Sequence, residues 1–79
     1  IMAVNELERD YLQMLHSCDV IEMIIAGQKM KDAPDEERKS NIGGIIMSLE
    51  MEILDDKYSG KDLSRINSVI AKGRTYWKS

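Results

Sequence analysis

Apolar residues recur at intervals of three and four along most of this chain, and this spacing restricts its fold more than any other feature. The three series are Val4, Leu7, Tyr11, Met14, Cys18, Ile21, Ile25; then Ile42, Ile46, Leu49, Ile53; and finally Leu63, Ile66, Ile70, Gly73, Trp77. Residues three and four apart lie on one face of an α-helix, whereas a half-buried strand alternates. The sequence therefore predicts an all-α fold, a small three-helix bundle that forms a single domain over residues 1–79.

The boundaries of these helices are predicted at about residues 3–31, 35–56 and 61–77. Asn5 can cap the first helix, and Ala33 is pushed out of helical geometry by the proline that follows it. Pro34 and the three carboxylates after it are typical of a helix start. Ser59 with Asp62 three residues later resembles a capping box for the third helix.

Two helix breaks stay open. The first helix could restart near Ser17, although its apolar series runs on without interruption. Gly43-Gly44 lies inside the second helix, where two glycines together cost about 1–2 kcal/mol relative to alanine. Either the helix restarts there, capped by Ser40 or Asn41, or a neighbouring backbone approaches closely. We favour the close approach.

The chain carries more apolar residues than one helix face per helix can hold. A core built from only 79 residues is marginal without a staple or a partner, and one cysteine with one histidine supplies neither a disulfide nor a zinc site. The residues outside the main series are Val20, Met23 and Ile24 on the first helix and Met47, Met51 and Leu54 on the second. We expect them to form an interface in a homo-oligomer or with a protein partner. In the alternative interpretation, a C-terminal tail with Tyr76 and Trp77 covers the group on the first helix.

The charges are divided unevenly along the chain. Residues 1–56 hold 13 acidic and five basic side chains, whereas residues 57–79 hold six basic side chains and one acidic. The basic and aromatic residues of the third helix that could bind an anion are Lys61, Arg65, Lys72, Arg74, Tyr76 and Trp77. They form either a solvated face that pairs with the acidic helices or a site for a small anionic ligand such as a nucleotide. Duplex DNA is not expected, because the pI is near 5.0.

Residues that could carry catalysis are nearly absent. Two positions apart on a helix, His16 and Cys18 diverge, and Asp55-Asp56 lacks further ligands for a metal. We expect no enzyme, no cofactor, no metal and no membrane span, and the acidic N-terminal region favours a cytoplasmic location over secretion. The sequence therefore predicts a non-enzymatic interaction protein that self-associates and regulates or inhibits another macromolecule, a type that includes small regulators of phages and mobile elements. Binding of a small anion is the alternative.

Overall fold

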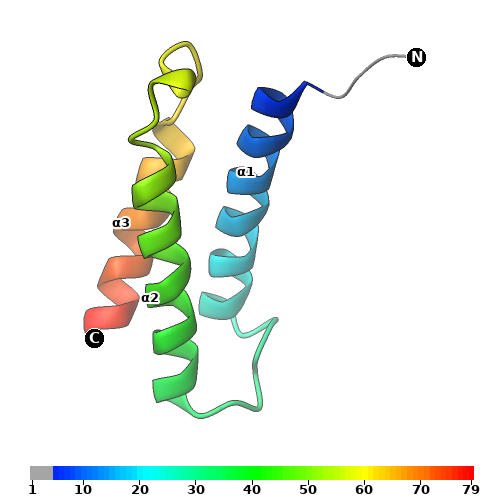
Figure 1. Cartoon of the computed structure of the whole chain (residues 1–79). Helices are drawn as coiled ribbons and strands as arrows, with labels where there is room; N and C mark the ends of the chain where they lie inside the picture. The colour runs from blue at the N-terminus through cyan, green and yellow to red at the C-terminus, as the bar shows by residue number, and fades with distance from the viewer. Residues whose placement is uncertain (1–4) are drawn as a thin grey trace.

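Three α-helices form the protein in the computed structural model, which describes residues 5–79. The elements are α1 (Glu6–Ile25), α2 (Asp35–Glu52), the short 3-10 helix η1 (Asp56–Tyr58) and α3 (Ser64–Lys78). Successive helices run in opposite directions, and α3 returns behind α2 in the view of Figure 1. The predicted all-α three-helix bundle is confirmed. Residues 3 and 4 of the predicted first helix lie outside the described residues.

The core lies where α3 packs against the other two helices. Its buried residues are Met14, Cys18, Ile21, Ile24, Ile42, Ile46, Leu49, Tyr58, Ile66, Val69 and Ile70. α2 and α3 share the most extensive contact, and α1 and α2 share the least of the three helix pairs. The side of α2 that faces away from α3 is therefore left with little cover from the rest of the chain.

Glycine permits the close approach of α2 and α3. A Cβ at Gly73 would lie 2.8 Å from Cδ1 of Ile46 and 3.3 Å from Cγ2 of Ile42. A Cβ at Gly43 would lie 3.3 Å from Nε1 of Trp77, and α2 runs on through this position without a break. Close packing is therefore found at Gly43, but the neighbour is the Trp77 side chain and not the backbone that was predicted. The predicted close approach is wrong for Gly44, which has no neighbour within 4 Å of the place its Cβ would take.

The first helix ends earlier than predicted, at Ile25 and not near residue 31. Gly27 follows with a φ of 77°, a left-handed conformation that glycine adopts without steric cost. The amide of Gln28 donates to the carbonyl of Met23 (2.8 Å), and that of Gly27 donates to Ile24 (3.1 Å). These bonds satisfy the last carbonyls of the helix as a Schellman motif. The predicted cap by Asn5 is confirmed, and α1 has no break at Ser17.

The turn between α2 and α3 also differs from the prediction. α2 ends at Glu52, and the Asp55 side chain then accepts a hydrogen bond from the Lys57 amide at the start of η1. The predicted capping box of Ser59 and Asp62 is wrong. Instead, the Asp62 carboxylate accepts from the backbone N–H of Ser64 (3.0 Å) and from its hydroxyl (2.6 Å). These hydrogen bonds lower the pKa of Asp62 below its ordinary value.

Candidate interaction surface on α2

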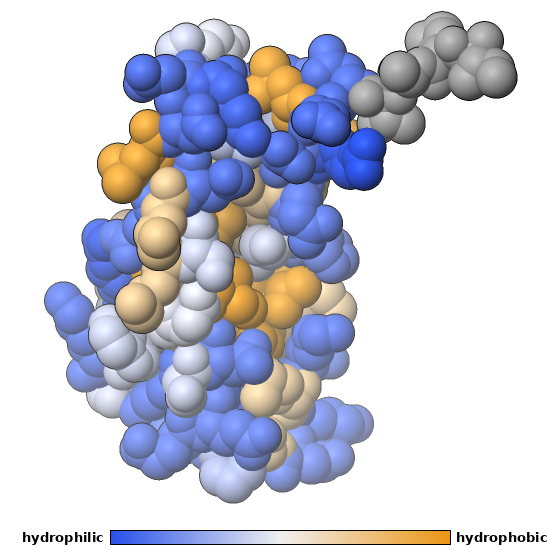
Figure 2. All heavy atoms as spheres, in the orientation of Figure 1, coloured by the Kyte–Doolittle hydropathy of each residue, from blue (hydrophilic) through white to orange (hydrophobic). Residues whose placement is uncertain are grey.

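α2 presents apolar side chains on both of its sides. Ile42, Ile46 and Leu49 are buried against the other helices. On the opposite side, Met47 is 61% exposed, Met51 73% and Leu54, just beyond the helix end, 80%. Figure 2 shows apolar atoms gathered over α2 on the outside of the molecule. A surface helix of a monomer normally turns a polar side to water, so this second apolar side is unusual.

Three small residues lie beside these large side chains. Ser40, Gly44 and Ser48 are spaced by four residues and are all exposed. At 3.6 residues per turn, they fall with the large side chains within about a third of the helix circumference. We call this set the α2 face; its members are Ser40, Gly44, Met47, Ser48, Met51 and Leu54. Its surface alternates between protruding apolar side chains and flat, small positions.

The centre of the α2 face contains no charge. Residues 40–49 include no acidic or basic residue, although 32% of the chain is charged. Ten residues make almost three helical turns, so an uncharged stretch of this length leaves the solvent side of the helix uncharged as well. Contact with another surface here would not strip water from any ionised group, which is the most costly desolvation.

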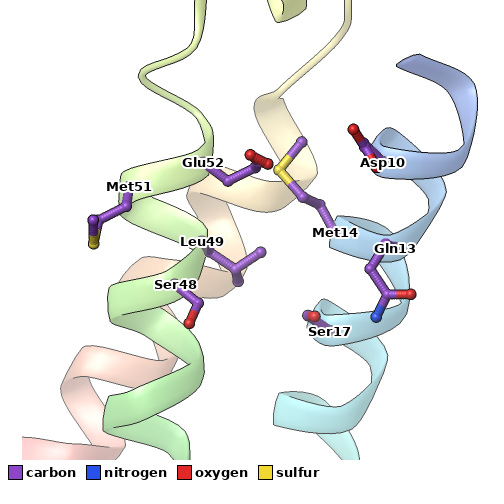
Figure 3. A pocket seen from close by; sticks show the side chains of 8 residues that line it. All are labelled: Asp10, Gln13, Met14, Ser17, Ser48, Leu49, Met51 and Glu52. Carbon is purple, nitrogen blue, oxygen red and sulfur yellow. The ribbon is translucent and has the colours of Figure 1, made fainter. Parts of the chain in front are cut away.

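A groove of about 530 Å³ borders the α2 face on the side of α1. Figure 3 shows Met14 of α1 and Leu49 of α2 pointing toward each other across it, while Met51 points away from α1. The rim carries the polar side chains of Gln13, Ser17 and Glu52, among others. Met14 and Leu49 are 4% and 3% exposed, so both belong to the core and contribute little accessible surface of their own to the groove.

The predicted interface residues of α1 are placed differently from those of α2. Ile24 is 2% exposed and lies in the core, and Val20 is half-buried against the core. Met23 is 40% exposed, beside a shallow hollow that Lys72 of α3 also lines. Of the six predicted residues, the α2 group therefore forms one exposed surface, and the α1 group contributes only Met23 to the outside of the molecule.

Three of the four cations of the predicted anion site are paired with carboxylates of the same chain. Arg65 contacts Asp19 (2.6 Å) and Glu22 (3.1 Å) of α1, and this pairing raises the pKa of the Arg65 guanidinium. The other two pairs are Lys61 with Glu8 and Arg74 with Glu50. Such exposed pairs contribute about 0–1 kcal/mol each. These pairs correspond to the predicted solvated basic face, whose cations pair with acidic residues of the same chain.

The two aromatic residues near the C-terminus do not form a stacking platform with these cations. The Tyr76 hydroxyl accepts a hydrogen bond from Arg38 (3.3 Å) and donates one to Asp35 (3.4 Å). Trp77 lies against Gly43 and is 46% exposed. Over residues 5–79, Lys72 is the one cation of the predicted anion site without an ion pair.

The described part of the chain holds no further cluster of reactive groups. Between residues 5 and 79, no group of three or more histidine, cysteine or acidic side chains could hold a metal ion. No helix in that range is both long enough and apolar enough to cross a membrane. Cys18 is fully buried, as predicted, and burial raises the pKa of its thiol. His16 is exposed on the other side of α1.

No family model, curated protein or solved structure matches this chain. The functional site is therefore identified from geometry, and the α2 face is its strongest feature. The sequence pattern revealed the large residues of this face but missed the small ones. Their four-residue spacing was visible, yet only the structure shows that Gly44 faces open space while Gly43 is covered.

Proposed function

We propose that this chain is a non-enzymatic interaction protein that self-associates through the α2 face and regulates or inhibits another macromolecule by occupying its surface. The exposure of Met47, Met51 and Leu54 is the observation that carries this proposal. Full burial of each such side chain contributes about 1.5–3 kcal/mol, which is a large share of the few kcal/mol expected of so short a chain. A second surface that covers them would stabilise the fold as well as the complex.

The chemistry of the exposed side chains supports a docking role. Methionine has three rotatable bonds and a polarizable sulfur, so Met47 and Met51 can adapt to different partner surfaces. The one cysteine is a free, buried thiol, which suits the reducing interior of a cell, and we place the action of the protein there.

Self-association is tested by a charge placed on the α2 face between Met47 and Leu54. Met51→Lys should shift the assembly to monomer without unfolding it, because Met51 is 73% exposed and contributes little to the core. Leu12→Lys is the matched control, since Leu12 is 59% exposed but lies on α1. Light scattering at concentrations up to millimolar measures the mass. A wild-type chain that stays at 9.0 kDa would contradict the self-association.

The regulatory role is tested with the same three chains as baits in extracts of the native host. A true target is retained by the wild type and by Leu12→Lys and is lost with Met51→Lys. Binding that survives the Met51→Lys change would show that the α2 face is not the surface that binds the target.

A small anionic ligand remains the second candidate, supported by the exposed Lys72, which lies in no ion pair among the described residues, and by the exposed Lys78 next to Trp77 in the sequence. The ion pairs of Arg65 and Arg74 weigh against it, since a phosphate would have to displace their carboxylates. Trp77 is the only tryptophan, so its fluorescence reports on binding nearby. If a panel of nucleotides causes no fluorescence change and no thermal shift, this candidate is ruled out.

A further inference from the structure

We infer that the α2 face binds α2 of a second copy of this chain, antiparallel and about a two-fold axis, with Met47 against Gly44 of the partner subunit and Met51 against Ser40 of the partner subunit. The inference rests on the proposed self-association and specifies its geometry.

The two contacts are compatible with a single symmetry axis. In a two-fold interface, residue i contacts residue j of the partner while j contacts i. The midpoint of positions 44 and 47 is the same as that of positions 40 and 51, between Ile45 and Ile46. One axis at this point therefore seats both methionines of each copy on small residues of the other. A parallel arrangement would instead set methionine against methionine and glycine against glycine.

Space and charge also favour a second copy as the occupant. The Gly44 position faces open space to at least 4 Å, and a residue without a side chain lets another helix approach closely. Each copy carries a net charge of −3, which opposes association in general. Because residues 40–49 are uncharged, the central turns of the two helices meet without like charges facing each other. The antiparallel direction also aligns the helix dipoles favourably.

The exposed area sets the expected strength of the dimer. Trp77 extends the α2 face, since it lines a shallow hollow together with Ser40, Gly44 and Met47. At about 200 Å² for each large free side chain, the exposed fractions of Met47, Met51, Leu54 and Trp77 provide on the order of 500 Å² per chain. Two copies would bury about 1,000 Å², which is the lower limit for a specific interface. The dimer should therefore be weak and concentration-dependent.

Disulfide cross-linking tests the register. The chains Ser40→Cys and Met51→Cys are oxidised separately and as a mixture, with the wild type as control because Cys18 is 0% exposed. The pairing predicts a cross-link between the two different chains in the mixture and none in either chain alone, since like positions would lie about 16 Å apart along the axis. A cross-link in either single chain, or a dimer that forms no cross-link, would overturn this register while self-association stands. A chain that stays monomeric up to millimolar concentration would overturn both.

A substitution at Gly44 gives a second, independent test. Gly44→Leu replaces glycine by a strong helix former in open space, so it should raise the unfolding temperature of the dilute monomer. It also fills the position that receives Met47 of the partner subunit, and it should weaken dimerisation at least tenfold. Ser68→Leu adds the same side chain at an exposed site on α3 and should leave dimerisation unchanged. Dimerisation of Gly44→Leu as tight as the wild type would refute the pairing.

Discussion

Replacing Gly73 and Gly44 by alanine should change stability in opposite directions, although both lie inside helices. Alanine is favoured over glycine in a helix interior by about 0.8–1.0 kcal/mol. Gly44→Ala should gain this amount in full, because nothing lies within 4 Å of the new methyl group. At Gly73 the methyl group would lie 2.8 Å from Ile46, which is 2% exposed and therefore confined within the core.

The cost at Gly73 follows from this confinement. Overpacking a well-filled core costs about 1–3 kcal/mol, which exceeds the helix gain and leaves a net loss of about 1 kcal/mol. The two variants should therefore differ by about 2 kcal/mol, or about 8–16 °C in unfolding temperature for a domain of this size. Gly43→Ala should fall between them, since the half-exposed Trp77 can move away from the new methyl group.

Thermal and urea unfolding, followed by far-ultraviolet circular dichroism on dilute protein, measures these differences. Low concentration keeps the chain monomeric, so that a change in association does not enter the result. A Gly73→Ala variant as stable as the wild type, or more stable, would refute the close packing of α2 against α3.

Two further predictions concern buried groups. Burial in the folded state raises the pKa of the Cys18 thiol above its ordinary value of 9.0. The contribution of Cys18 to the free energy of unfolding is therefore complete below pH 9.0 and is lost as the pH rises through the pKa of the folded state. Urea unfolding above pH 9 should show this loss in the wild type and less of it in Cys18→Ala; an equal loss in both would assign it to other groups. Tyr58 is 1% exposed, so Tyr58→Ala should cost about 3–5 kcal/mol, whereas Tyr58→Phe keeps the packing and should cost about 1 kcal/mol. Equal costs for both Tyr58 variants would show that its ring does not hold the turn to the core.

The helices could be predicted from the sequence because their apolar spacing reports directly on burial. The ends of the helices were harder to predict, since the residue at which a helix starts or stops depends on single hydrogen bonds. α1 ends at Ile25, just before Gly27 and six residues before the predicted end at residue 31, and Asp62 caps Ser64 instead of pairing with Ser59. Competing caps of similar strength are not distinguished by sequence spacing alone.

The candidate site could be predicted in part. Met47, Met51 and Leu54 lie off the main apolar series of α2, and their separation from the core follows from helical periodicity. Ile24 and Val20 also lie off their series, yet Ile24 is buried in the core and Val20 packs against that core. Periodicity gives the direction of a side chain, whereas the position of a third helix decides whether that direction is covered.

A dilution series followed by nuclear magnetic resonance tests most directly whether two copies of this chain meet at the α2 face. Backbone amide signals of the wild-type chain are recorded from millimolar to low micromolar concentration. We expect concentration-dependent shifts confined to residues 40–54 and to the Trp77 indole N–H, with α1 and the outer side of α3 unchanged. Spectra that do not change on dilution, or shifts that map to α1, would contradict the account.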